Sequence, residues 1–276
     1  FDGSHVRDAI KEIIPTTPTL DLSLRGGIQE GTWTLVTGQK KTGKSSLLLQ
    51  IAANAQKMGK HVYYLNVEHR FSVRNLTTVH HLKTTPDCFT LIESTKEKIL
   101  TSQDFLNIAI DIISNHPGCV LIIDSVSALC SANEMSRDIG ENSRPEGPKM
   151  FGAFCRRMAS VVPINNFSVL CVLHLISNTS GYGSPWVEDG GVKIQYQADY
   201  KLKVKQISNW EEGNGETKKR IGHTVQWEVA FNHLGPPGDV VTTYLRYGWG
   251  FDDTWEIITL GIDLGLILKS GAWFQF

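Results

Sequence analysis

The sequence lacks long hydrophobic runs and has no sign of export. No stretch of its 276 residues approaches the ~18 consecutive apolar residues that a membrane-spanning helix needs. No secretory leader is visible at the N-terminus. The five cysteines form no C-x-x-C pair, and three of them lie in or beside apolar runs, which is typical of buried free thiols in a reducing compartment. We therefore expect a cytoplasmic protein that has no membrane partner.

A surplus of charge of one sign is lacking as well. The chain carries 27 basic and 28 acidic residues, a net charge of −1. A nucleic-acid partner would therefore have to bind a local basic patch rather than a generally basic surface. Internal repeats and low-complexity tracts are also absent, and the length of 276 residues suits one large α/β domain or a core with a small appendage.

The most informative feature that is present is an octapeptide with the phosphate-binding pattern G-x-x-x-x-G-K-[ST]. A strand-like stretch at 32–37 precedes it, and a helix-like stretch at 46–55 follows it. The amides of such a loop and the N-terminus of its helix bind phosphates. We expect Lys44 to contact the β- and γ-phosphates and Ser45 to bind Mg²⁺. The expected nucleotide-binding residues of this segment are Gly38, Gln39, Lys40, Lys41, Thr42, Gly43, Lys44, Ser45 and Ser46.

Further along the chain, apolar strands alternate with helical segments, a rhythm typical of a mostly parallel sheet. Strands are expected at 61–67, 120–124 and 168–173, and helices at 102–114 and 150–161. After Ala198 the strands become half-exposed, which indicates an antiparallel extension of the sheet. These strands are expected at 200–207, 225–231 and 240–247, before a helix at 254–264 and a small hairpin at 265–276. The predicted fold class is α/β.

Polar side chains follow three of these strands. Asp124 ends the strand at 120–124, and we expect its carboxylate to hold Mg²⁺ through water. Glu68 directly follows the strand at 61–67. Because the carboxyl ends of parallel strands form the ligand crevice, we expect Glu68 beside the γ-phosphate, where it would polarise the attacking water as a general base. His174 should face the same crevice, either as a satisfied core histidine or as a sensor of the γ-phosphate.

The order of these parts resembles the RecA family of homologous-recombination ATPases and is most similar to the phage UvsX-type recombinases. The resemblance extends from about Pro18 to Phe276. Besides the phosphate loop, it rests on Thr19-Leu20-Asp21, Gly26-Gly27-Ile28, Asn66-Val67-Glu68-His69, Ile123–Leu129, Asp138–Glu141, Gly190-Gly191, Gly248–Asp252, Leu264–Ile267 and Gly271–Phe274. It implies a RecA-like P-loop ATPase core at 17–276, with a mostly parallel central sheet, an antiparallel extension and a C-terminal hairpin. It also implies ATP and Mg²⁺ as cofactors, and it favours the sensor role for His174.

Members of this family bind DNA through two mobile loops, which the resemblance places here at 134–149 and 175–191. Both stretches are rich in Gly, Pro and Ser and are poorly suited to regular structure. Cations give salt-sensitive phosphate contacts, and aromatic rings stack on bases of any sequence. The residues expected to bind DNA are Arg137, Arg144, Lys149, Arg156, Arg157, Tyr182, Trp186, Gly190 and Gly191. For any one charged residue, a solvated side chain without a ligand is the alternative.

Two stretches depart from the family pattern. Family members place two cations where they reach the γ-phosphate held by the neighbouring subunit, but the corresponding stretch 229–234 has only His233. A neutral imidazole substitutes poorly for Lys or Arg, so filament-activated hydrolysis is expected to be weak or to use another residue. Near the base site, the usual acid and aromatic residue are replaced around Ser72, which leaves Phe71 or Arg74 to stack on adenine.

The family assembles head to tail, with ATP between protomers and an N-terminal segment docked on the next core, which produces a helical filament. Residues 1–16 are the expected N-terminal segment here, and the apolar face at 6–14 suits either that docking element or a short helix that caps its own core. The leading hypothesis is a DNA-dependent ATPase that polymerises on single-stranded DNA and pairs it with homologous duplex DNA of any sequence. Mediator and single-strand-binding proteins would be further partners. A mediator or paralogue with little hydrolysis is the alternative, and the C-terminal resemblance disfavours a ring-forming translocase.

Overall fold

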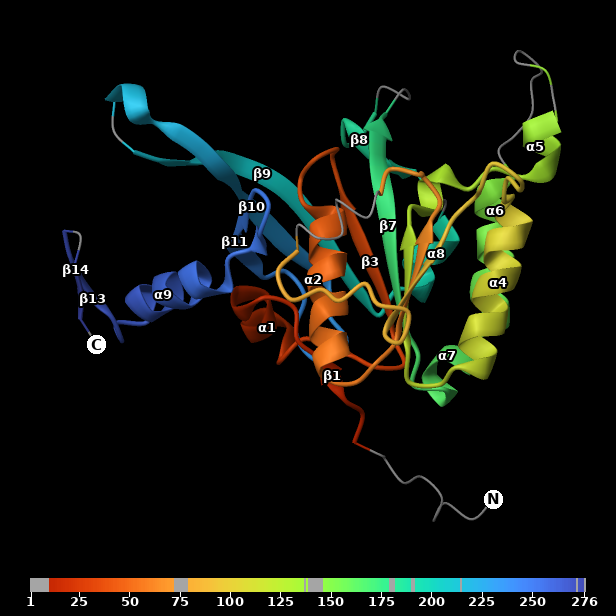
Figure 1. Ribbon diagram of the computed structural model, residues 1–276, viewed down its shortest axis with the longest axis horizontal. Helices are drawn as coiled ribbons and strands as arrows, with labels where there is room; N and C mark the ends of the chain where they lie inside the picture. Colours follow the sequence, from red (N-terminus) through yellow and green to blue (C-terminus); the bar gives the residue numbers. More distant parts are fainter. Residues whose placement is uncertain are drawn as a thin grey trace.

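A twisted sheet with helices on both faces forms the body of the protein (Figure 1). The computed structural model describes residues 10–71, 79–136, 138, 146–178, 182–189, 192–213, 215–271 and 273–275, without the side chains of 192 and 193. The strand order in the described sheet is β12 (Gly250–Phe251), β11 (Val240–Arg246), β10 (Lys219–Phe231), β9 (Tyr200–Glu212), β3 (Trp33–Gly38), β7 (Ser168–Ser177), β6 (Val120–Asp124), β4 (Val62–Asn66) and β5 (Phe89–Ile92). Strand β8 (Trp186–Asp189) pairs with β7 beside this path. The predicted α/β class, with a mostly parallel centre and an antiparallel extension, is confirmed.

The parallel strands determine which residues meet at their carboxyl ends. These strands are β3 (Trp33–Gly38), β4 (Val62–Asn66), β5 (Phe89–Ile92), β6 (Val120–Asp124) and β7 (Ser168–Ser177). In the β3–β7 register Gly38 is the partner of His174, and in the β4–β6 register Asn66 is the partner of Asp124. The end of β3, the end of β6 and the middle of β7 therefore lie along one edge of the sheet.

Apolar side chains cover both faces of the parallel strands. On β6, Val120 and Ile122 belong to one buried cluster, while Leu121 and Ile123 belong to a second cluster on the opposite face. The first cluster packs against α1 (Pro18–Leu24) and α2 (Lys44–Lys57). The second packs against α4 (Ser102–Asn115), α6 (Gly147–Met158), α7 (Val161–Ile164) and α8 (Val192–Gln197). Strands that are buried on both faces have continuous apolar sequences, which is why β3, β4, β6 and β7 were predictable, whereas the partly exposed β5 was not. Among the described helices, none combines the length and apolarity that crossing a bilayer requires.

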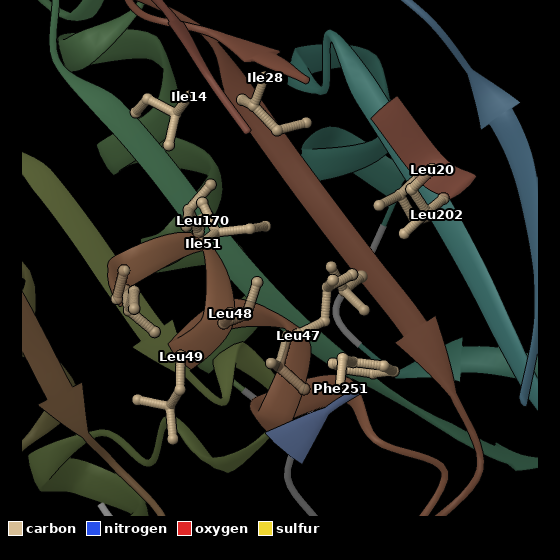
Figure 2. Packing of buried hydrophobic residues seen from close by; sticks show 14 of the residues in the cluster. Ile14, Leu20, Ile28, Leu47, Leu48, Leu49, Ile51, Leu170, Leu202 and Phe251 are labelled. Atoms are coloured by element: carbon tan, nitrogen blue, oxygen red, sulfur yellow. The ribbon is translucent and has the colours of Figure 1, made fainter. Parts of the chain in front are cut away.

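Helix α2 is buried on most of its circumference. Its side chains Leu47, Leu48 and Ile51 pack among residues of several strands, including Leu170 of β7 and Leu202 of β9 (Figure 2). A helix that is apolar on most sides is held by packing rather than by its own propensity. Its N-terminus, where the phosphate loop ends, is therefore fixed relative to the sheet.

The antiparallel extension is longer than the sequence predicted. It consists of β9 (Tyr200–Glu212), β10 (Lys219–Phe231), β11 (Val240–Arg246) and β12 (Gly250–Phe251), with the short helical turn η3 (Gly215–Thr217) between β9 and β10. The outer halves of β9 and β10 form an exposed ribbon that projects from the body (Figure 1). In β9, residues 205–209 are exposed on both faces, so this part of the sequence lacks the alternation that would have revealed a strand. The C-terminal helix α9 (Asp253–Asp263) and the hairpin of β13 (Leu268–Ser270) and β14 (Trp273–Gln275) are confirmed.

The described part of the N-terminal segment is a strand. Residues Ile13–Ile14 form β1, which pairs with β2 (Ile28–Gln29), and Ile14 is fully buried in the first cluster. A short helix at 6–14 was one of the forms considered for this segment. That form is wrong for Ile13 and Ile14, because their backbone pairs with β2 instead. The Lys60 ammonium also ties this segment down, since it contacts Glu12 at 2.7 Å and Glu30 at 2.9 Å. Residues 1–9 lie outside the described part.

The two stretches that were expected to lack regular structure contain some of it. The first begins within α5 (Ala132–Ser136) and ends within α6. In the second, β7 continues to Ser177 and pairs with β8 (Trp186–Asp189) as an antiparallel arm. The expectation is wrong for these ends. Helices α5 and α6 extend into the first stretch, and in the second the pairing of β7 with β8 outweighs the turn-rich composition. The further elements that were not predicted are α1, α5, α7, α8, β2, β5, β8, β12, η3 and the turn η2 (Val126–Ala128).

Candidate functional site

The phosphate loop has the backbone geometry that its glycines allow. A Cβ on Gly38 would lie 2.5 Å from the carbonyl oxygen of Val204 on β9, so only glycine fits there. Gly43 precedes α2 with φ +96°, a conformation that L-residues rarely adopt. Thr42 Oγ1 donates a hydrogen bond to the carbonyl of Gln39 at 2.8 Å and closes the loop on itself.

Lys44 is buried at the start of α2. Its Nζ donates to the carbonyl oxygens of Gly38 at 2.9 Å and Gln39 at 2.6 Å. Burial lowers the pKa of this amine to about 8, while the carboxylates of Asp124 and Glu68 act in the opposite direction. The ammonium form thus predominates at neutral pH, and Lys44 presents its charge inside the concave loop.

Asp124 and Ser45 lie together, as predicted from the sequence. Ser45 Oγ donates to Asp124 Oδ2 at 2.5 Å, and the hydroxyl of Tyr64 donates to the same oxygen at 2.6 Å. Burial raises the pKa of Asp124, and the two hydroxyl donors act against that rise. A hydroxyl beside a carboxylate is a set of oxygen ligands that suits Mg²⁺. Sequence reasoning missed Tyr64, although a tyrosine in a buried strand needs a partner for its hydroxyl.

Glu68 is held by three side chains just after β4. Ser125 Oγ at 2.5 Å and His174 Nε2 at 2.8 Å donate to Glu68 Oε1, while Arg70 Nε lies 2.8 Å from Oε2. Burial raises the pKa of Glu68, but the hydrogen bonds from His174 and Ser125 and the nearby positive charge outweigh it and lower the pKa to about 2. The carboxylate is therefore ionised throughout the physiological pH range. Sequence reasoning predicted Glu68 and His174 but missed Ser125 and Arg70.

His174 connects this carboxylate to the β7–β8 arm. Its backbone N–H donates to Ser127 Oγ at 3.0 Å, and Ser127 Oγ donates to the carbonyl of Asp189 at 2.5 Å. Asp189 is also the β8 partner of His174 in the register of the arm. The side chain of His174 thus contacts Glu68, while its backbone is bound to η2 and β8. The sequence contained no local signal for Ser127 or Asp189, because both contacts arise between distant segments.

One pocket gathers most of the predicted nucleotide-site residues. Its lining comprises Lys40, Lys41, Thr42, Gly43, Lys44, Ser45, Ser46, Asn66, Glu68, Arg70, Phe71, Asp124 and His174. Gly38 and Gln39 contribute the carbonyl groups that Lys44 contacts. Phe71 packs edge-on against Tyr64, with ring centroids 5.2 Å apart, and Arg74 lies outside the described residues. The groups that were expected to bind phosphate, to bind Mg²⁺ and to activate water therefore converge on a single space.

The residues expected to bind DNA fall into separate places. Tyr182 and Trp186 are exposed on the β7–β8 arm, and Lys149 is exposed in the first turn of α6. Arg156 and Arg157 are exposed in the last turn of α6, which leads to α7 at the end of the molecule away from β8 (Figure 1). The remaining expected residues, which lie outside the described part, are Arg137, Arg144, Gly190 and Gly191.

His233 does not line the phosphate pocket of its own chain. Its Nδ1 lies 3.6 Å from Asp199 Oδ1, and its ring centroid lies 6.0 Å from that of Tyr200. The position follows β10, on the antiparallel side of the sheet.

Comparison with known proteins agrees with this geometry. The family model of the RecA N-terminal domain matches residues 3–252. Protein RecA of Solidesulfovibrio magneticus is 28% identical over 286 residues, which cover 100% of this chain and 74% of that protein. Protein RecA of a Sulfurovum species is 27% identical over 267 residues, which cover 93% of this chain and 72% of that protein. The chromosomal Protein RecA of Lactococcus lactis is 27% identical over 281 residues, which cover 99% of this chain and 69% of that protein.

Proposed function

The chain belongs to the RecA N-terminal domain family, and from this membership we propose that it is a DNA-dependent ATPase that acts as a recombinase. It would form a helical filament on single-stranded DNA and catalyse homologous pairing and strand exchange. The observation that carries the proposal is the convergence of the phosphate loop, Asp124, Glu68 and His174 in one pocket. Within the family, the order of motifs supports a recombinase of the phage UvsX type.

The loop and α2 would bind the triphosphate. Backbone amides at the start of α2 and the Lys44 ammonium would bind its anionic oxygens, and the fixed position of α2 would keep these donors aligned. Ser45 and Asp124 would hold Mg²⁺, since their oxygen atoms lie 2.5 Å apart in a buried setting. When bound, this ion neutralises charge on the β- and γ-phosphates.

Glu68 would orient the attacking water. With a pKa of about 2 it accepts a hydrogen bond strongly but removes a proton weakly, so polarisation and positioning are its main contributions. The water oxygen forms a bond to the γ-phosphorus while the bond to the bridging oxygen breaks, and ADP leaves with that electron pair. The proton of the water passes to an oxygen of the transferred phosphoryl group, while Glu68 keeps the water oriented.

His174 would link nucleotide and DNA. It contacts Glu68 through its side chain and reaches β8 through Ser127 and Asp189, and β8 carries the exposed Trp186. Any change in the Glu68 contact thus acts on the arm that presents an aromatic side chain. Such a connection suits a protein in which each ligand stabilises the conformation that it prefers.

The proposed partners follow from the same hypothesis. They are single-stranded and double-stranded DNA of any sequence, further copies of the chain, and mediator and single-strand-binding proteins. Residues 17–276 would form the ATPase and DNA-binding core, while 1–16 would dock on a neighbouring protomer. The site of action would be the cytosol of a bacterium, whether the gene belongs to the cell or to a phage.

ATP hydrolysis measured with and without single-stranded DNA tests the proposal. We expect strong stimulation by DNA, and we expect Glu68→Gln to lower turnover about 100-fold or more while ATP binding persists. Glu97→Gln, at an exposed residue away from the pocket, is the matched control. Binding of ATP and DNA without stimulated turnover would instead favour the second candidate, a recombination mediator with little hydrolysis. The observation that favours this candidate is His233, a histidine beside Asp199 where the family pattern has Lys or Arg.

A further inference from the structure

We propose that Arg70 is a further catalytic residue, whose guanidinium binds the γ-phosphate of ATP held by the same chain. The inference rests on the proposed ATPase function and adds the cation that stabilises charge on the transferred phosphoryl group. Arg70 lies two residues after Glu68, in the segment that follows β4.

Arg70 lies at the border of two adjoining pockets. Together with Glu68 and His174 it lines the phosphate pocket. The same three residues line a second pocket with Val67, Ser127, Ala128 and Asp189. The guanidinium therefore lies between the phosphate-binding space and the contacts that lead to the β7–β8 arm.

The distribution of charge in the phosphate pocket gives Arg70 a distinct role. Among the described lining residues the cations are Lys40, Lys41, Lys44 and Arg70. All three lysines belong to the phosphate loop, and Lys44 donates to the carbonyls of that loop. Arg70 instead approaches from the strand that carries Glu68, the side on which water would attack. Phosphoryl transfer spreads charge over the three equatorial oxygens, so a cation on that side acts where the loop lysines do not.

The side chain has the freedom that such a contact requires. Arg70 is 63% exposed, whereas its partner Glu68 is 9% exposed and is also held by Ser125 and His174. The contact with Glu68 uses Nε of Arg70. A guanidinium carries five donors, so the terminal nitrogens can bind phosphate oxygens while Nε keeps this contact.

A simpler explanation is that the ion pair between Arg70 and Glu68 only stabilises the fold, but the exposure of the Arg70 side chain argues against it. Ion pairs with a well-exposed partner contribute little to folding. Ser125 and His174 both donate to Oε1 of Glu68, so this oxygen is satisfied without Arg70, which contacts Oε2. A cation in this position is better explained by an anion that it binds during the reaction.

Arg70→Ala and Arg70→Lys test the inference, with Lys96→Ala as a control at an exposed residue outside both pockets. We expect Arg70→Ala to lower kcat about 100-fold or more with KM changed less than about threefold, and Arg70→Lys to recover part of the rate. Affinity for ADP with aluminium fluoride, which mimics the transferred phosphoryl group, should fall by a similar factor. Affinity for ADP alone should persist.

An unchanged kcat, or an equal loss of affinity for ADP and for the aluminium fluoride complex, would overturn the inference. Circular dichroism checks that each variant folds, and Arg70→Gln replaces Arg70→Ala if the latter does not. Rates without DNA separate this inference from the proposed function. A wild-type chain that hydrolyses ATP without stimulation by DNA contradicts the recombinase proposal, while the basal rates and the ADP–aluminium fluoride affinities still test Arg70.

Discussion

Two neighbouring carboxylates have opposite pKa shifts, and the donors around them explain the difference. Asp124 is more deeply buried and receives only neutral hydroxyl donors, so its pKa is raised. Glu68 has His174 and Arg70 beside it, so its pKa falls to about 2 in spite of burial. Carboxyl groups whose environments differ in this way take different roles. Asp124 is suited to bind a cation in place of its hydroxyl donors, whereas Glu68 is suited to remain an anion that orients water.

Glu256 of α9 provides a prediction about pH, away from the nucleotide pocket. It is fully buried, accepts a hydrogen bond from the backbone N–H of Thr19 at 3.2 Å, and burial raises its pKa from 4.5 to about 7. The folded protein therefore keeps a proton that the unfolded chain releases between these two pH values. As pH rises through this window, the free energy of unfolding falls, by on the order of 2 kcal/mol for this group. Glu256→Gln should remove that part of the pH dependence and stabilise the protein at pH 8.

Chemical denaturation at pH 5 and pH 8 measures this effect. Asp21 and Asp253, whose pKa values are both raised to about 6, contribute in the same direction, so the dependence should shrink rather than vanish. An identical pH dependence in Glu256→Gln and the wild type would contradict the assignment. Glu97→Gln, at an exposed carboxylate, is the control.

The β7–β8 arm is the element that connects the pocket to the expected DNA-binding surface. Its β8 strand is held by four residue pairs with β7, by Ser127, and by an ion pair between Glu188 and Lys201 of β9 at 2.8 Å. The two side chains of this pair are 12% and 7% exposed. Removing one partner of a buried pair leaves an uncompensated charge, which is costly.

Lys201→Met should therefore release β8 from the sheet. We expect faster amide hydrogen exchange at 186–189 and about tenfold weaker binding of single-stranded DNA. The neighbouring pair of Lys203 and Glu228 offers a matched control on the same strand, because its side chains are 45% and 47% exposed. Lys203→Met should change exchange in the arm little. Equal effects of the two variants would show that the buried pair does not hold the arm.

The molecule as a whole has almost no net charge, so its overall field does not attract DNA. With a net charge of −1, the proposed DNA binding would depend on local groups, which we expect at the edge that carries β8 and the start of α6. Aromatic stacking there would be insensitive to sequence and to salt, whereas each phosphate contact would add to the salt dependence.

Trp186→Ala and Lys149→Ala separate these two contributions. Trp186→Ala should weaken binding of single-stranded DNA about tenfold with an unchanged salt slope, whereas Lys149→Ala should reduce the slope by about one. Fluorescence anisotropy over a salt series, with two unrelated DNA sequences, measures both. Trp273→Ala is the control, since Trp273 is exposed on the C-terminal hairpin, far from β8 (Figure 1). A sequence-dependent loss, or an equal loss with Trp273→Ala, would contradict the prediction.

The amino-acid sequence was sufficient for the phosphate loop, the central strands and the acids at their ends. Apolar runs, glycine spacing and the order of elements are local signals, and they predict Lys44, Ser45, Glu68 and Asp124 without any knowledge of contacts. The C-terminal helix and hairpin were predictable for the same reason.

Tertiary structure alone decided which groups surround these residues. Arg70 lines the pocket, and Tyr64 and Ser125 donate to its carboxylates, because strand register and a turn bring them there. No periodicity in the sequence encodes these contacts. The β8 strand exists through pairing with β7, and β1 through pairing with β2, so their composition gave no sign of either. Local pattern determines what each segment is able to form, whereas register between distant segments determines the partners of every side chain in the site.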